Sequence, residues 1–159
     1  GNCEALAAKE YFDCHSQGRF RRAREGGMPN PALNYGYAVL RAATARALVG
    51  SGLSCIAGIH HCNQYNAFAL ADDVMEPYRP FIDDIVLNHP DRFPEDAPEL
   101  TRDMKAALLG VLAVDADLDS MRRPLMNALS CTTASLARCF LKEDQTIAYP
   151  TLPAPCPPQ

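Results

Sequence analysis

The sequence of 159 residues has no long apolar run, no CxxC pair and no excess of basic charge. Without an apolar run near the roughly 20 residues that span a bilayer, no membrane anchor is expected. Glu4, Lys9 and Glu10 interrupt any apolar core that a signal peptide would need. The formal net charge of -4 gives no global attraction to nucleic acid, so such a partner requires a local basic patch or a metal.

The cysteines point to a reduced protein. They number seven, an odd count, and none forms a CxxC pair, which argues against a zinc ribbon. Cys55, Cys131 and Cys139 lie among apolar neighbours, where free thiols pack as small hydrophobic groups. We therefore expect a reducing, cytoplasmic compartment.

Helical patterns dominate the chain and β patterns are sparse. The sequence predicts an all-α fold, with one helical domain over residues 1–150 built from about five main helices, followed by a proline-rich tail over residues 151–159. Asn2 is the expected cap of the first helix. The second is expected to begin with Asn30 as cap and Pro31 as first helical residue, and to run to about Val49. Its predicted buried stripe is Leu33, Tyr37, Leu40, Thr44 and Leu48.

The other three helices are predicted from the same period. The third begins near Asn66 and is expected to kink at Pro77 and Pro80. The fourth opens at Asp96, and Ser120 is the expected cap of the fifth. The apolar positions predicted to face inward are, in chain order, Phe68, Ala71, Met75, Tyr78 and Ile82, then Leu100, Met104, Ala107, Leu108 and Val111, then Met121, Leu125, Leu129, Thr132, Leu136 and Phe140.

One segment, GIHHCNQYNAFALADDVMEPYR over residues 58–79, indicates chemistry. His61 is followed fifteen positions later by Glu76, and a histidine with a carboxylate can hold a divalent cation. The preceding histidine points elsewhere, because neighbouring residues in a loop face different directions. The alternative is that His61 is a surface or core residue and that Asp72, Asp73 and Glu76 form a solvated acidic face.

Arginines near this segment and near the N-terminus have two readings as well. Arg19, Arg22 and Arg24 are either a charged loop or contacts to phosphate, which guanidinium groups match in geometry. Arg79 lies one turn after Glu76, so it either forms an i,i+3 ion pair or touches the same phosphate. The residues alone thus indicate a candidate metal site in a helical domain.

Three blocks, NCEALAAKEYF, NPALNYGYAVLRAA and GIHHCNQYNAFALADDVMEPYRP, occur in this order and spacing. Together they closely resemble the C-terminal catalytic domain of the CRISPR-associated adaptation integrase, in its type II branch, and the resemblance extends to about Pro150. It implies a site for Mn or Mg in which Glu4, His61 and Glu76 are the metal ligands and catalytic residues, with Arg79 on the basic position that contacts DNA. Cys62 beside His61 leaves zinc open as an alternative.

The resemblance also implies an activity and partners. The activity is that of a metal-dependent DNA endonuclease and integrase of CRISPR adaptation, which inserts spacers by phosphoryl transfer with a DNA 3′-hydroxyl as nucleophile. The partners are a foreign-DNA fragment, the CRISPR repeat, a second copy of the chain in a homodimer, and a small CRISPR-associated subunit, in the prokaryotic cytoplasm without a membrane. The competing hypothesis is a non-catalytic helical module for assembly or DNA binding.

Two further expectations follow from the resemblance. The family carries a β-rich N-terminal domain that is absent before Gly1, so we expect Glu4 to be poorly anchored and this chain to bind metal weakly and integrate poorly alone. We also expect the basic residues to concentrate on one face for DNA. The candidates for that face are Arg19, Arg22, Arg24, Lys105, Arg122 and Arg123.

Overall fold

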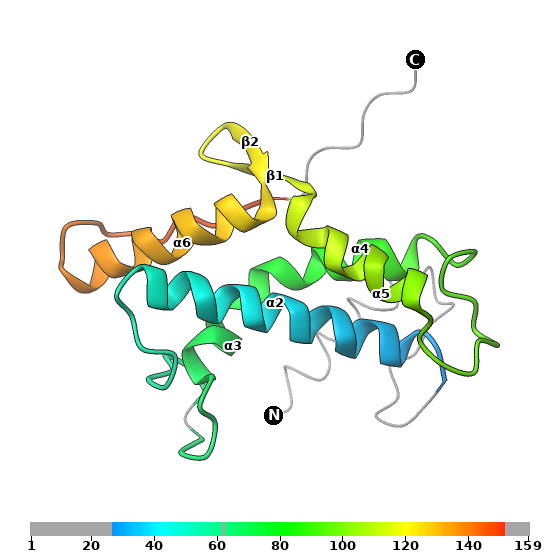
Figure 1. Ribbon diagram of the computed structural model, residues 1–159. Helices are drawn as coiled ribbons and strands as arrows, with labels where there is room; N and C mark the ends of the chain where they lie inside the picture. Colours follow the sequence, from blue (N-terminus) through cyan, green and yellow to red (C-terminus); the bar gives the residue numbers. More distant parts are fainter. Residues whose placement is uncertain (1–26, 62, 152–159) are drawn as a thin grey trace, which may run out of the picture.

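The computed structural model describes residues 27–61 and 63–151, and they form a mostly helical unit with one small hairpin (Figure 1). The helices and strands, in chain order, are α2 (Asn30–Gly50), α3 (Ala69–Met75), the 3₁₀ helix η1 (Glu76–Tyr78), α4 (Arg79–Leu87), α5 (Arg102–Leu109), the 3₁₀ helix η2 (Gly110–Ala113), β1 (Asp115–Leu118), β2 (Met121–Pro124) and α6 (Leu125–Phe140). The predicted first helix lies outside the described residues. Among the described helices, none has both the length and the apolar character needed to cross a membrane.

Helix α2 is the central element of the fold. It packs against α3, α4, α5 and α6, and Figure 1 shows it running through the middle of the molecule. All five residues of the predicted stripe are buried, as the helical period requires. The predicted cap is wrong: Pro29 occupies the N-cap position, while Asn30 is the first helical residue and its backbone N–H donates to the carbonyl of Gly27.

The expected kink in the third helix is confirmed. Pro77 and Pro80 divide the segment into α3, η1 and α4, because each ring removes a backbone donor and clashes with the preceding turn. Its start is later than predicted, at Ala69. Phe68, predicted to be buried, is the residue before the helix and is 43% exposed.

The fourth helix also begins later than predicted. Thr101, not Asp96, is the N-cap of α5: its hydroxyl accepts from the N–H of Met104 at 3.3 Å, and its own N–H donates to the Met104 sulfur at 3.5 Å. Met104, Leu108 and Val111 are buried as expected. The prediction followed the Asp96 pattern because both sites offer a capping oxygen.

The all-α prediction needs correction at the hairpin. β1 and β2 pair antiparallel, with Leu118 opposite Met121, and the two turn residues Asp119 and Ser120 have φ angles of 52° and 62°. Positive φ at both positions is typical of the two-residue hairpin turn that suits the twist of the strands. Ser120 is therefore a turn residue, not a helix cap, and Met121 is 57% exposed in a strand.

Helix α6 follows the hairpin and begins only at Leu125. Of its predicted inward residues, Leu125, Leu129, Thr132 and Leu136 are buried, whereas Phe140 is 56% exposed at the helix end. Beyond α6, the chain returns to the hairpin, where Thr151 and Asp117 exchange two backbone hydrogen bonds of 2.8 and 3.1 Å. Thr151, which was assigned to the tail, is thus paired with β1. The rest of the tail lies outside the described residues.

Two groups of buried side chains hold these elements together. The larger one joins α2, α4, α5, the hairpin and α6. The smaller one fixes α3 and consists of Leu48, Leu70, Ala71, Val74 and Leu136. A helix of seven residues is unstable alone, so α3 depends on this burial, at about 1.5–3 kcal/mol for each large apolar side chain. The packing of α3 positions the side chains described next.

Candidate metal and DNA site

The carboxylate of Asp73 on α3 holds the loop that carries the two histidines. Three successive backbone N–H groups donate to it: those of Ile59 at 2.5 Å, His60 at 2.9 Å and His61 at 3.2 Å. The imidazole Nδ1 of His61 is a fourth partner, 2.5 Å from Asp73 Oδ1. The carboxylate therefore fixes both the backbone of the loop and the ring of His61.

The environment keeps Asp73 ionised. Its side chain is only 9% exposed, and burial opposes ionisation, but the hydrogen bonds from His60, from the ring and backbone of His61 and from Ile59 outweigh burial and lower the pKa of the carboxyl. An ionised carboxylate only accepts hydrogen bonds, so Nδ1 of His61 carries the proton that it donates. In the neutral form of this half-exposed ring, the lone pair is on Nε2, the arrangement found in metal-binding histidines.

Gly58 allows the loop to approach α3. A Cβ atom at this position would lie 2.4 Å from the carbonyl oxygen of His61 and 2.9 Å from Cβ of Ala69. The first neighbour is backbone and cannot move aside. The sequence GIHH thus requires glycine at its first position for a steric reason.

Glu76 and Arg79 form the ion pair that was one of the two readings of their spacing. Oε1 of Glu76 lies 2.8 Å from Nη2 of Arg79, and both side chains are partly exposed. The guanidinium of Arg79 also lies over the ring of Tyr37, 5.0 Å from its centroid. The hydroxyl of Tyr37 in turn donates to the buried carboxylate of Asp83.

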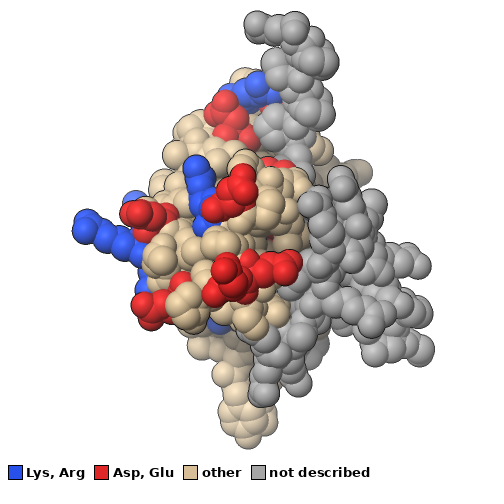
Figure 2. Space-filling view, turned by 90° about the vertical axis from the view of Figure 1, so that its right-hand side faces the viewer, with Lys and Arg blue, Asp and Glu red and all other residues tan. Residues whose placement is uncertain are grey.

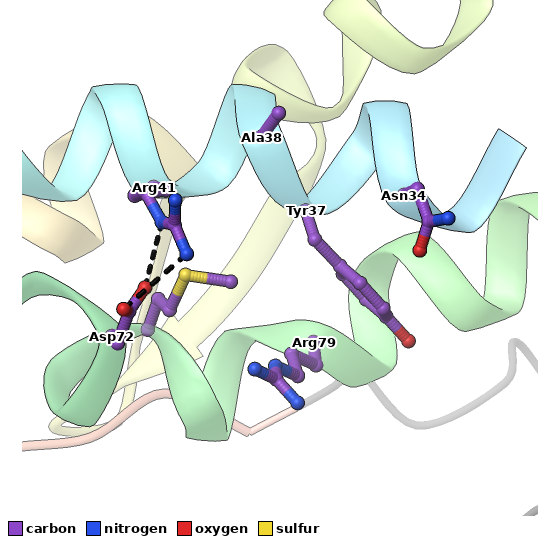
Figure 3. A pocket seen from close by; sticks show the side chains of 7 residues that line it. Asn34, Tyr37, Ala38, Arg41, Asp72 and Arg79 are labelled. Atoms are coloured by element: carbon purple, nitrogen blue, oxygen red, sulfur yellow. Dashed lines mark hydrogen bonds and ion pairs between the residues drawn. The ribbon is translucent and has the colours of Figure 1, made fainter. Parts of the chain in front are cut away.

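A cavity of about 220 Å³ lies between α2 and α3, and Figure 3 shows it from close by. Its lining side chains are Asn34, Tyr37, Ala38, Arg41, Asp72, Met75 and Arg79. Asp72 is nearly buried and accepts from Nε and Nη2 of Arg41, at 2.7 and 3.3 Å. Two guanidinium groups thus border one cavity, the first paired with Asp72 and the second with Glu76.

Several predicted site residues lie outside the described part of the chain. These are Glu4, Arg19, Arg22, Arg24 and Cys62. Within residues 27–61 and 63–151, no group of three or more His, Cys, Asp or Glu side chains is arranged to hold a metal ion. The predicted set of Glu4, His61 and Glu76 therefore remains a prediction.

Asp73 is a candidate site residue that sequence reasoning missed. The pattern grouped it with Glu76 on an acidic helix face, whereas its carboxylate is directed to the histidine loop. The available signal was a Gly-x-His-His turn, which exposes consecutive backbone donors, followed by an acidic pair eleven and twelve residues after His61.

Only some residues of the predicted basic face lie in the described part of the chain. Lys105 is exposed on α5, Arg122 pairs with Asp117 at 3.2 Å, and Arg123 contacts the sulfur of Cys131 at 2.9 Å. On the face shown in Figure 2, Lys and Arg side chains are interspersed with Asp and Glu. Because three of the six candidates lie outside the described residues, the basic face stays a prediction.

Comparisons with known proteins agree with the three quoted blocks. The sequence model of the family described as CRISPR associated protein Cas1 matches residues 2–93. A CRISPR-associated endonuclease Cas1 of Neisseria meningitidis serogroup C is 46% identical over 88 residues, covering 55% of this chain and 29% of the relative. One from Pyrobaculum aerophilum is 30% identical over 140 residues, covering 86% of this chain and 47% of that relative. The chain spans less than half the length of these curated relatives.

A solved structure has the same fold. It is described as a casposase bound to integration product, and it superimposes with a TM-score of 0.72 over 91% of this chain and 50% of its own, at 21% identity. The family match extends over more than half of the sequence, and it includes the histidine loop, Asp73 and Glu76. The chain therefore belongs to the Cas1 family of CRISPR-associated proteins.

Proposed function

We propose that this chain is the catalytic part of a metal-dependent DNA endonuclease and integrase that inserts spacers during CRISPR adaptation. The reaction is phosphoryl transfer, with a DNA 3′-hydroxyl as nucleophile in integration and water in cleavage. Relatives that are named endonucleases support the nuclease activity, and the likeness to a casposase bound to integration product supports integration. The proposal extends to the type II branch on the strength of the three sequence blocks.

The observation that carries the proposal is the contact between His61 and Asp73. The carboxylate of Asp73 binds Nδ1 of His61 and three backbone N–H groups of the loop that carries this histidine. Such a carboxylate is typical of metal-binding histidines, because a fixed tautomer and orientation raise the affinity for the ion. Asp73 acts as a positioning residue in this proposal, and Nε2 of His61 as the metal ligand.

The residues present suit Mn or Mg. The proposed ligands are the imidazole of His61 and the carboxylates of Glu76 and Glu4, a set rich in oxygen with one nitrogen. A bound cation would neutralise charge that develops on the reacting phosphate. A carboxylate can bridge an arginine and a cation, so the ion pair of Glu76 with Arg79 is compatible with a ligand role.

The remaining side chains would bind and orient DNA. Arg79 is held against Tyr37 and beside Glu76, and this fixed guanidinium is the proposed contact to a DNA phosphate. Arg19, Arg22 and Arg24 complete the proposed DNA contacts. The proposed assembly is a homodimer that binds a small CRISPR-associated subunit, the foreign-DNA fragment and the CRISPR repeat.

The activity test uses the full-length protein on branched or half-site DNA with Mn²⁺. His61→Ala and Glu76→Ala are expected to reduce cleavage and strand transfer at least about 100-fold, and Asp73→Asn by about 10- to 100-fold. His89→Ala is the matched control, because His89 is exposed away from the loop, and it should be fully active. Undiminished activity in His61→Ala or Glu76→Ala would refute the assignment.

The competing hypothesis is a non-catalytic helical module for assembly or DNA binding. Residues 27–61 and 63–151 contain no complete set of metal ligands, so Mn²⁺ binding has to be tested directly. Titration with Mn²⁺ separates the two functions, because a bound ion stabilises the fold by about 2.7 kcal/mol at a concentration of one hundred times Kd. The module predicts no shift in melting temperature with Mn²⁺, and no effect of changing Glu4.

A further inference from the structure

Tyr65 is a large aromatic side chain that is 86% exposed, four residues after His61. In Figure 1 the segment that carries it, residues 63–68, projects below α3. A single exposed apolar residue needs no explanation in general. The way in which this turn is built gives Tyr65 a more specific meaning.

Three hydrogen bonds shape the turn around Tyr65. The side-chain oxygen of Asn63 accepts from the backbone N–H of Tyr65 at 3.0 Å, and the carbonyl of Asn63 accepts from that of Asn66 at 2.9 Å. The side-chain oxygen of Asn66 accepts from Phe68 N–H at 3.0 Å. Asparagine turns of this kind fix the backbone locally, so the Cα atom that carries the Tyr65 side chain has a defined position.

Both ends of the turn are attached to consecutive residues of α3. His61 is bound to Asp73, and the amide of Asn66 donates to Asp72 at 2.8 Å. Asp72 is itself held by Arg41 of α2. The Cα atoms of His61 and Tyr65 are at most about 14 Å apart, since four residues separate them. That span corresponds to about four nucleotide steps of a stacked, duplex-like strand at 3.4 Å each, and to fewer steps of an extended strand.

The sequence segment that contains Tyr65 has no acidic residue. Between Arg46 and Asp72 the sequence has no Lys, Arg, Asp or Glu, although the chain as a whole has a net charge of -4. At the end of the same turn, the guanidinium of Arg41 lies 6.0 Å from the centroid of the Phe68 ring. An uncharged aromatic ring beside the proposed phosphate site suits the face of a nucleobase, because all four bases stack on aromatic rings.

We propose that Tyr65 is a stacking platform for an unpaired base of the DNA strand, within about four nucleotides of the phosphate bound at His61. The inference rests on the proposed function and sharpens its substrate, which must present a single-stranded or splayed base at this place. Tyr65 is then a positioning residue, because it holds the strand while the phosphate reacts elsewhere.

The test measures the Kd of the chain for a fluorescent single-stranded oligonucleotide with a free 3′-hydroxyl. Tyr65→Ala is expected to raise Kd about 5- to 150-fold, as the loss of one stacked base does. Tyr65→Phe keeps the ring and should bind within about twofold of the wild type. Ile56→Ala is the matched control, since Ile56 is 66% exposed in the same uncharged segment but has no ring.

A second series of oligonucleotides identifies the base. Each lacks one base among the first four from the 3′ end. Removal of the stacked base should raise the Kd of the wild type, whereas the Kd of Tyr65→Ala should not rise further. Equal Kd values for wild type and Tyr65→Ala on intact DNA would overturn the stacking role, and a lost contact with a protein partner would not rescue it. If His61→Ala still abolished cleavage in that case, the proposed function would be kept and only the stacking role rejected. Absence of DNA binding by the wild type would overturn both.

Discussion

Three carboxylates in one short stretch of helix have three different partners. Asp72 binds Arg41 and Asn66, Asp73 binds the histidine loop, and Glu76 binds Arg79. Each is therefore bound by a specific donor, so the three carboxylates do not simply form a solvated acidic surface. Consecutive residues on a helix point about 100° apart, and for this reason the adjacent aspartates contact different neighbours.

At the residue scale, Gly58→Ala should open the histidine loop. The added Cβ would meet the backbone of His61 at 2.4 Å, so the loop must move away from Asp73. We expect the free energy of unfolding to fall by about 1–3 kcal/mol, as in other overpacked sites. Urea denaturation measures this, and NMR chemical shifts of the His61 and Asp73 amides report the loop.

Gly110→Ala is the matched control for that substitution. Gly110 has a helical φ of -61°, and a Cβ atom there would meet nothing within 4 Å. Alanine should leave the stability unchanged or raise it by up to about 1 kcal/mol. A loss in the control as large as that in Gly58→Ala would show that the effect is not specific to the loop.

At the element scale, Gly36 allows α2 and α4 to pack closely. A Cβ atom at this position would lie 2.5 Å from Cγ2 and 2.9 Å from Cδ1 of the buried Ile82. Gly36→Ala gains about 1 kcal/mol of helix propensity, but the clash is expected to dominate and to lower the free energy of unfolding by about 1–3 kcal/mol. Thermal or urea unfolding of the purified chain measures the balance.

A double-mutant cycle assigns that loss to the contact. In Gly36→Ala combined with Ile82→Ala, the new methyl group occupies part of the space vacated by the isoleucine. The double variant should then be at least about 0.5 kcal/mol more stable than the sum of the two single changes predicts. Strict additivity would contradict a direct clash between α2 and α4.

The sequence predicted the elements whose apolar period is long and failed where short-range signals compete. The stripe of α2 and most of that of α6 extend over several turns, so their burial was predicted correctly. Ser120 was assigned as a cap because a serine before an apolar run is typical of a helix start. Its positive φ depends on pairing between β1 and β2, strands of only four residues whose alternation is too short to detect.

At the scale of the whole molecule, Tyr78 connects three distant segments. Its hydroxyl lies 2.7 Å from Oγ1 of Thr132 on α6. The hydroxyl of Thr132 in turn donates to the carbonyl of Ala148 at 2.6 Å. Burial raises the pKa of Tyr78 above its ordinary value, and the hydrogen bond with Thr132 opposes this only in part. The folded chain thus keeps a proton that the unfolded chain loses near pH 10.

This linkage gives a prediction with a defined sign. At pH 8, Tyr78→Phe should be about 1 kcal/mol less stable than the wild type, because one buried hydrogen bond is lost. A raised pKa contributes stability that is complete below pH 10 and declines as the pH rises above it. The wild type should therefore lose up to about 1.4 kcal/mol per pH unit more than the variant, and the gap should close.

Urea denaturation at pH 8 and above pH 10 measures this difference. Tyr65→Phe is the control, since Tyr65 is 86% exposed and its substitution should change the stability at neither pH. A gap between wild type and Tyr78→Phe that stays constant above pH 10 would contradict a buried, protonated Tyr78.

Candidate residues for the site could be named from the sequence, but the contacts that they make could not. His61, Glu76 and Arg79 were identified from spacing, and the ion pair between the last two is confirmed. The contact of His61 with Asp73 depends on how the loop folds back over α3, which no helical period describes. Glu4 lies outside the described residues, so its part in the site stays a prediction.

The attachment of the histidine loop to Asp73 has a consequence for affinity. A flexible imidazole on an exposed loop would have to be ordered each time an ion binds, and that loss of conformational freedom would weaken binding. Here the ring and the three amides around it are already ordered when the chain folds. The loop is thus preorganised, and under the proposed function His61 would bind an ion without the cost of ordering its loop at that moment.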